Sequence, residues 1–424
     1  MLNCEKCVPG FNRRHFLRFS LGAGAGLAAA SLPHSVLAQQ TVAGQRSGKT
    51  AKAVIMLWMG GGPTQYETFD PKPGTKNAGP FKAIDTTAPG MKFSEIMPIC
   101  ASQGKNMSVI RSMATHEGAH ERGTSLMHIG TQPIQGLDIP STGTVISYEK
   151  GDKKFPLPHF IAMDPPLIPQ SAVFGEDYLP FRLNTGGGNP IPNTQRAVAK
   201  DRDNERAKLL LEQNKEWDSK RQQKEVAKVE AAYVKSEDVM NTPLLNAFNI
   251  GSDSKRGEYQ GRFAQNCLMA RRLVEAGCSF VEIGLGGWDM HSDVAGGMKR
   301  NGPELDKGMG TLIKDLAEKD LLKETMVLWA GEFGRTPDVN GGNGRDHWAN
   351  GFSVVMAGGG IQGGRVHGDT GPNGAGCSKP VSIHDFFATL YRACGINWQK
   401  NYDTEGRKIK YVASSNAKPV ATLF

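Results

Sequence analysis

The sequence predicts one large α/β domain built around a mostly parallel β-sheet. Short apolar runs stop at glycine-rich loops, and amphipathic helical stretches lie between several of these runs. Strands that alternate with helices in this way are typical of sheets with helices on both faces. A chain of this length can also bury a full core without disulfides.

The N-terminus carries a predicted export signal. Arg13 and Arg14 form a twin-arginine pair before a weakly apolar stretch rich in Gly and Ala, and residues 35–38 offer a cleavage point. That stretch is too short for a stable transmembrane helix, so we expect residues 1–38 to be a twin-arginine (Tat) signal peptide. The Tat translocon would deliver the protein to the periplasm or the medium, with residues 39–424 as a single domain.

The charge of the chain excludes one class of partner. Removal of the signal lowers Lys plus Arg from 50 to 46 and Asp plus Glu from 42 to 41, so the net charge falls from +8 to +5. The basic residues are spread out, and no zinc-finger spacing or aromatic-interleaved basic patch occurs. We therefore expect no binding to nucleic acid.

Five apolar runs are the predicted strands, and four of them lead into glycine-rich loops. The runs are 54–58, 107–110, 279–285, 325–329 and 352–356. Amphipathic spacing predicts helices at 263–276, 302–318 and 383–393, the first of them capped by Gly277. A charged stretch predicts a helical insertion around 201–240, which is an exposed cap in the simplest interpretation.

Ligands bind at the carboxyl ends of the strands in open α/β sheets, so the loops there hold the candidate site residues. Asp289 and His291 follow the third strand and are two residues apart, so both side chains point the same way in an extended segment. A carboxylate and an imidazole from one loop suit a divalent metal. The alternative is that His291 is a structural histidine.

Two more candidate pairs surround the fourth and fifth strands. Glu332 directly follows a buried strand, where an unpaired carboxylate is costly, so it either binds a ligand or pairs with Arg335. Asp346 and His347 form another acid–imidazole pair before the fifth strand. Arg345 beside them could bind an anionic oxygen through two guanidinium nitrogens.

The loops after the first and second strands carry the remaining candidates. Glu67 and Asp70 are candidate ligands after the first strand, unless Asp70 only caps a turn. His120 and Thr124 follow the second strand, where a nucleophile could lie at a helix N-terminus that also favours anions. The alternative is that Thr124 is an ordinary helix-capping residue.

With these loops assembled, the chain resembles the domain-of-unknown-function family numbered 1501, exported proteins grouped with alkaline phosphatases and sulfatases. The matching stretches are 57–64, 68–73, 111–113, 287–291, 331–337, 344–348 and 357–361. The resemblance implies an alkaline-phosphatase-like fold with paired divalent metals, of which zinc fits the donors best and manganese or calcium are alternatives. By the same resemblance, one metal site comprises Asp289, His291 and His347, and the second draws on Glu332 and on Asp70 or Glu67.

Two functions are consistent with these residues. The first is a metal-dependent hydrolase of phosphate or sulfate esters. In it, Arg345 or Arg335 would steady the anionic ester substrate, and His120 or Thr124 would act as the nucleophile. The alternative is a non-catalytic protein that keeps the fold and binds a cell-surface glycan or an exported partner protein. Glycines where the hydrolases place an aspartate after the first strand, and the charged insertion, favour this alternative.

Overall fold

The structure is a computed structural model that describes residues 50–168, 170–186, 190–191, 194, 198–221, 235–404 and 406–424. The expected signal peptide and the middle of the expected insertion, 222–234, lie outside the described residues. Residues 47–424 cluster into one compact unit. Within the described ranges, every helix is too short or too polar to cross a bilayer.

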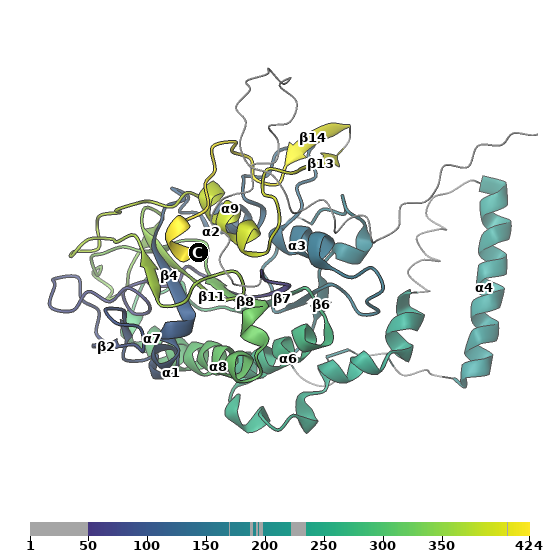
Figure 1. The fold of residues 1–424 in the computed structure, drawn as a ribbon, viewed down its shortest axis with the longest axis horizontal. Coiled ribbons are helices and arrows are strands. Elements are labelled where there is room, and N and C mark those ends of the chain that lie inside the picture. Colours follow the sequence, from purple (N-terminus) through teal and green to yellow (C-terminus); the bar gives the residue numbers. More distant parts are fainter. Residues whose placement is uncertain are drawn as a thin grey trace, which may run out of the picture. The chain divides into compact units, whose positions relative to one another are not determined.

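An eight-stranded sheet forms the centre of this unit and confirms the predicted α/β class with a mostly parallel sheet (Figure 1). Across the sheet, the strands are β12 (Arg365–His367), β4 (Met107–Met113), β11 (Phe352–Gly358), β8 (Thr325–Ala330), β1 (Ala53–Met59), β7 (Phe280–Leu285), β5 (Phe160–Met163) and β6 (Phe181–Leu183). Only β11 runs antiparallel to its two neighbours, and the other pairs are parallel. All five predicted strands are present.

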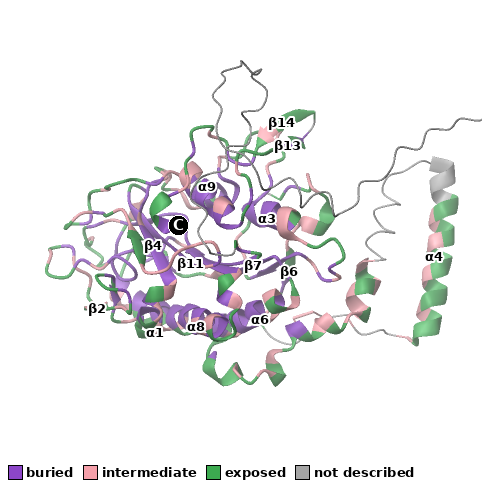
Figure 2. Ribbon diagram, viewed as in Figure 1, coloured by how far each residue is buried: buried purple, intermediate pink, exposed green. Residues whose placement is uncertain are grey.

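Helices cover both faces of the sheet. Alternate side chains of each central strand point to opposite faces, so both faces of the sheet are apolar and are buried by helices. Ile55 and Leu57 of β1 belong to one core, and Val54 and Met56 to the other. The first core includes α1 (Pro98–Ser102), α6 (Arg262–Ala276), α7 (Val294–Leu305) and α8 (Thr311–Glu318). The second includes α2 (His120–Ile129), α3 (Thr142–Lys150) and α9 (Ile383–Ala393). Figure 2 shows the buried residues gathered between these layers.

Two of the three predicted helices are confirmed, and the third is longer than predicted. Helices α6 and α9 match 263–276 and 383–393, and Gly277 ends α6 in the left-handed region with a φ of 113°. The predicted helix at 302–318 instead begins at Val294. Helix α7 continues through a π-helical turn, Asp306–Gly310, into α8. Three glycines and Pro303 lie inside α7 and obscured its start in the sequence.

The charged stretch is helical wherever it is described, as predicted. Helix α4 (Lys200–Arg221) and a helical segment at 235–241 occupy it. The described side chains of α4 are exposed or half-buried, and Leu209 is 59% exposed.

Three small antiparallel pairs of strands lie outside the central sheet. They are β2 (Ala83–Asp85) with β3 (Lys92–Ser94), β9 (Gly334–Arg335) with β10 (His347–Trp348), and β13 (Asn401–Thr404) with β14 (Arg407–Lys410). The β9–β10 pair sets Arg335 opposite His347.

The direction of β11 brings the predicted site residues to one edge of the sheet. Strands β1, β4, β7 and β8 run the same way, so their carboxyl ends meet the amino end of β11. His120 follows β4, Asp289 follows β7, Glu332 follows β8 and His347 precedes β11. All four therefore lie at the edge where ligands bind in open α/β sheets.

Candidate metal centre

The loop after β1 supports the site through its backbone. The N–H of Gly61 donates to Glu332 Oε1 at 2.8 Å. The carbonyl oxygens of Gly61 and Gly62 accept hydrogen bonds from the guanidinium of Arg335. Gly61 has a φ of 114°, and a Cβ there would lie 2.5 Å from the backbone nitrogen of Asp289. Only glycine therefore lets the loops after β1 and β7 approach so closely.

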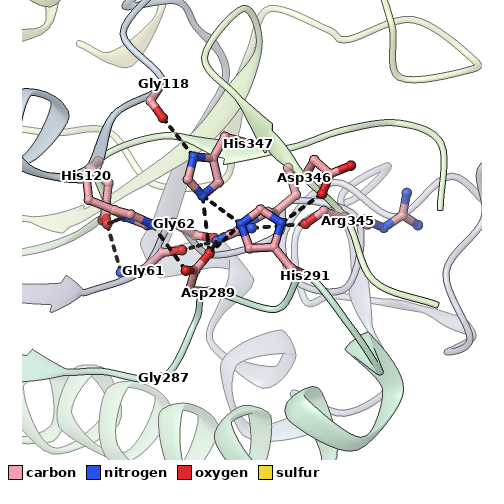
Figure 3. Close-up of polar contacts among 12 residues, drawn as sticks. Gly61, Gly62, Gly118, His120, Gly287, Asp289, His291, Arg345, Asp346 and His347 are labelled. Carbon is pink, nitrogen blue, oxygen red and sulfur yellow. Dashed lines mark hydrogen bonds and ion pairs between the residues drawn. The ribbon is translucent and has the colours of Figure 1, made fainter. Parts of the chain in front are cut away.

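Three histidines and one aspartate converge above this loop (Figure 3). Asp289 Oδ1 lies 3.1 Å from His291 Nε2 and 3.2 Å from His347 Nε2, and Asp289 Oδ2 lies 3.3 Å from His120 Nε2. His120, Asp289 and His347 each offer a ligand atom within 4.8 Å of the other two. The structure thus brings together the predicted Asp289, His291 and His347, and adds His120 to them.

Each of the three imidazoles has its second ring nitrogen fixed by an acceptor. Three contacts of 2.7 Å do this: His120 Nδ1 to Glu332 Oε1, His291 Nδ1 to Asp346 Oδ1 and His347 Nδ1 to the carbonyl of Gly118. Because these oxygens only accept, Nδ1 carries the hydrogen, and Nε2 of the neutral ring presents its lone pair to the centre. Metal-bound histidines are held in this way.

His291 Nε2 and His347 Nε2 are only 3.0 Å apart. With both ring hydrogens on Nδ1, two lone pairs face each other at this distance and repel. A cation or a proton between the two nitrogens removes that repulsion, and the carboxylate of Asp289 favours positive charge there. Imidazole nitrogens with a carboxylate form a donor set that suits zinc and also accepts manganese.

The charged side chains around the cluster have a net negative charge that suits a divalent cation. Asp289, Glu332 and Asp346 are three carboxylates that contact the histidines, and Arg335 contributes one guanidinium, which pairs with Asp289. With the imidazoles neutral, these four groups together carry two negative charges. One divalent ion would balance that charge.

The two exposed carboxylates stay ionised in neutral solution. Burial raises the pKa of Asp289, but hydrogen bonds from Arg335 and His347 outweigh burial and hold the pKa at about 2. Hydrogen bonds from His291 and Asn340 lower the pKa of Asp346. The carboxylate of Asp289 is therefore already ionised at neutral pH, as a metal ligand has to be.

Glu332 fixes the ring of His120 through its carboxylate. Its side chain is 2% exposed, and Oε1 accepts from both Gly61 N and His120 Nδ1. Oε2 is buried and has no hydrogen-bond partner among the described residues. The anticipated pairing of Glu332 with Arg335 is wrong, because Arg335 Nη2 lies 2.6 Å from Asp289 Oδ1 instead.

Arg345 lies in a buried network beside the cluster. Its side chain is fully buried, with Nη2 2.8 Å and Nε 3.1 Å from Glu67 Oε1, and its guanidinium packs over the ring of Tyr66. The expected anion-binding role therefore does not fit Arg345, because its donors are turned inward. The ion pair instead fixes the segment that carries His347, and it also occupies Glu67, the other candidate ligand after the first strand.

Asp70 lies in a second buried network. Its carboxylate is 2.9 Å from Lys72 Nζ and 3.3 Å from Arg111 Nη1, and it accepts a hydrogen bond from Thr370. Two cations thus neutralise Asp70 away from the histidine cluster, which does not fit the role of a metal ligand there.

Helix α2 places His120 at its N-terminus, as predicted, but Thr124 inside the helix. The helix begins at His120 with Ala119 as its N-cap, so Thr124 is not a capping residue. Thr124 is buried one turn further on, where its carbonyl accepts from His128 Nδ1. His120 has both ring nitrogens engaged, by Glu332 and Asp289, which suits a ligand better than a nucleophile.

Asn340 is a site residue that the sequence reading missed. Its side-chain amide donates to the carbonyl of His291 and to Asp346 Oδ1, both at 3.0 Å. It thereby ties the loop after β7 to the loop before β11. An asparagine in a Gly-rich turn is ordinary turn chemistry, so nothing in the local pattern distinguished this one.

Comparisons with known proteins give a family and several distant likenesses. A family model described as "Protein of unknown function (DUF1501)" matches residues 51–424. No curated protein matches the sequence.

Three solved structures show the range of the likenesses. The PsFucS1 sulfatase from Pseudoalteromonas sp. is 13% identical, with 82% of this chain and 68% of that chain covered and a TM-score of 0.41. The alkaline phosphatase from the Antarctic bacterium TAB5 is 13% identical, with 82% and 99% covered and a TM-score of 0.36. The lipoteichoic acid synthase LtaP from Listeria monocytogenes is 10% identical, with 86% and 74% covered and a TM-score of 0.36. These likenesses are distant, so the function of the chain has to be argued from its own side chains.

Proposed function

The chain belongs to the DUF1501 family of proteins of unknown function, and from that premise we propose that it is an exported, metal-dependent hydrolase of phosphate or sulfate esters. One divalent cation, zinc by preference and manganese or calcium as alternatives, would be held by His120, Asp289, His291 and His347. The observation that carries the proposal is the convergence of three imidazole Nε2 atoms on the Asp289 carboxylate, each ring fixed through Nδ1.

The exposure of the cluster supports a catalytic rather than a structural centre. The side chains of His120, Asp289 and His291 are 38%, 45% and 47% exposed. Structural metal sites are closed by their protein ligands, whereas catalytic sites keep one side open to substrate. A divalent cation at such a centre supplies Lewis-acid stabilisation to an ester oxygen that becomes more negative as the ester bond breaks.

Neighbouring groups, of which Arg335 and Glu332 are buried, hold the donors of the cluster in place. Arg335 is 1% exposed and fixes Asp289 from behind, so it is a positioning residue. Glu332, Asp346 and the carbonyl of Gly118 set the ring orientation of the three histidines. Donors held in this way need little rearrangement when a substrate binds.

Metal analysis of the purified protein tests the proposal. We expect one equivalent of metal per chain in the wild type, and less than a tenth of that in Asp289→Ala and His347→Ala. His367→Ala is the matched control, because His367 also has its Nδ1 held, by Thr422 Oγ1, but is the last residue of β12, an edge strand of the sheet.

Activity then separates the two candidate functions. A metal-loaded protein should hydrolyse aryl phosphates or aryl sulfates, and chelation followed by reloading should abolish and restore the activity. Metal without hydrolysis of either ester class would favour the non-catalytic alternative, binding of a glycan or an exported partner. Absence of metal from the wild type would remove the basis of the hydrolase proposal.

A further inference from the structure

A second concave site lies along β6, the edge strand of the sheet, and beside the N-terminus of α6. Two adjoining cavities of about 450 and 480 Å³ share several lining residues, among them Leu245 and Phe248. We call them together the arginine trough, defined by Arg182, Arg256, Arg262, Phe181, Leu245 and Phe248. Each cavity has the size of a typical small-molecule site.

The topology places one end of the arginine trough, where Asn184 and Thr185 follow β6, at the edge of the sheet that carries the candidate metal centre. Strands β5 and β6 run parallel to β7, so their carboxyl ends point to the edge where Asp289 lies. β6 is two strands away from β7, a separation of about 10 Å at the usual strand spacing. Helix α6 begins at Arg262 and leads into β7, so its N-terminus also lies at this edge (Figure 1). A chain-like ligand could therefore reach from one site to the other.

The charge of the arginine trough is positive. Three of the described lining residues are arginines, and none of the residues that line the two cavities is an aspartate or a glutamate. Arg262 makes one ion pair, at 3.3 Å from Asp164 Oδ2, and keeps 60% of its side chain exposed. Guanidinium groups bind sulfate, phosphate and carboxylate oxygens bidentately. The trough therefore suits an anionic ligand.

The remaining lining residues suit a sugar more than a simple anion. Side-chain amides of Asn184, Asn249 and Gln265 offer hydrogen bonds to hydroxyl groups. Phe248 contributes apolar surface to both cavities, and Phe181 lines the second cavity and is 44% exposed. An exposed aromatic ring beside amide groups offers an apolar face and hydrogen bonds together, as the C–H faces and hydroxyls of a sugar require.

We propose that the arginine trough binds an acidic saccharide, one that carries sulfate, phosphate or carboxylate groups. That the same saccharide carries the ester cleaved at the metal centre rests on the proposed function; binding in the trough does not.

Calorimetric titration with dextran sulfate oligosaccharides tests the binding. Arg256→Ala/Arg262→Ala should bind about tenfold more weakly or worse than the wild type, because each guanidinium makes charge-assisted hydrogen bonds. Arg365→Ala is the matched control, since Arg365 is an exposed arginine on β12, at the opposite end of the sheet from β6. Equal binding by the double variant and the wild type, with unchanged thermal unfolding of both, would overturn the proposal.

Two further binding experiments separate recognition of the sugar from recognition of its charge, and separate the arginine trough from the metal centre. Phe181→Ala should weaken binding of dextran sulfate and leave binding of inorganic polyphosphate unchanged. If polyphosphate binds as tightly as dextran sulfate and Phe181→Ala changes neither affinity, the trough recognises charge alone. The assignment of a saccharide is then wrong. Metal-free Asp289→Ala should bind dextran sulfate as the wild type does. The trough can therefore be confirmed even where the hydrolase proposal fails.

Discussion

Asp289 and Arg335 form an ion pair of 2.6 Å across the candidate centre, with the arginine buried and the aspartate open to solvent. Arg335 also donates to the carbonyl oxygens of Gly61, Gly62 and Arg345. One guanidinium therefore joins the loop after β1, the loop after β7 and the segment before β11. Arg335 thereby helps to fix the position of Asp289.

Arg335→Ala should lower the free energy of unfolding by about 3 kcal/mol, because it leaves the carbonyl oxygens of Gly61, Gly62 and Arg345 without their donor, and an unsatisfied buried acceptor costs about 1–3 kcal/mol. Arg335→Lys should recover part of the stability but not the metal affinity, since an ammonium cannot bridge several acceptors at once. Urea unfolding and metal titration check the two effects. Arg365→Ala is the surface control, and equal stability of Arg335→Ala and Arg365→Ala would contradict the prediction.

Asp346→Asn should weaken metal binding about 10- to 100-fold, the usual loss when the partner of a metal-bound histidine is removed. The cause is the 2.7 Å contact from Asp346 Oδ1 to His291 Nδ1. Asp338→Asn is the matched control, because Asp338 lies in the same loop and makes only an exposed pair with Lys76. Competitive titration against a chelator measures both affinities. A similar affinity in the two variants would rule out the supporting role of Asp346.

Gly61→Ala should abolish stoichiometric metal binding and destabilise the fold by more than the ~1–2 kcal/mol that an alanine in a left-handed conformation costs. The added Cβ would meet the backbone of Asp289 at 2.5 Å. Gly74→Ala isolates the conformational cost, since Gly74 has a φ of 73° and open space around its Cβ position. Thermal unfolding and metal content of the two variants give the comparison. If both lose the same stability and both keep the metal, the close approach at Gly61 is not essential.

Asp253 should make the protein less stable in acid. Burial raises the pKa of Asp253, but hydrogen bonds from the Lys255 N–H, Arg272 and Arg271 outweigh burial and lower the pKa to about 2. An unfolded aspartate titrates near pH 4. The stabilising contribution is therefore full above about pH 4 and is lost as the pH falls towards 2.

Asp253→Asn should flatten the pH dependence of the unfolding free energy between about pH 4 and 2. Chemical unfolding at a series of pH values measures this slope. Asp320→Asn is the control, because Asp320 makes an exposed pair with Lys323 and should leave the slope unchanged. An unchanged slope in Asp253→Asn would show that the buried pairs do not persist in solution.

Local pattern was enough to predict the central strands, because fully buried strands read as short apolar runs between glycines. It was not enough for β6 and β12, which have three residues each and are mostly exposed, or for β5, a run of only four apolar residues without a glycine-rich loop after it. The spacing of Asp289 and His291 correctly predicted that the two side chains meet. The partner of Arg335 could not be predicted, because three nearby loops offered carboxylates and only the packed fold selects Asp289. Arg345 shows the same limit, since only burial distinguishes a structural guanidinium from one that binds an anion.

The four donors of the candidate centre come from α2, the loop after β7 and β10, which lie far apart along the chain and meet only when the sheet is formed. If the centre binds an ion as proposed, the unfolded chain has no high-affinity site for it, and the free energy of ion binding would add to that of folding. For a chain exported in its folded form, as the proposed twin-arginine signal implies, the ion would be acquired before translocation. The cytoplasmic supply of metals, and not the periplasmic one, would then select which element the protein carries.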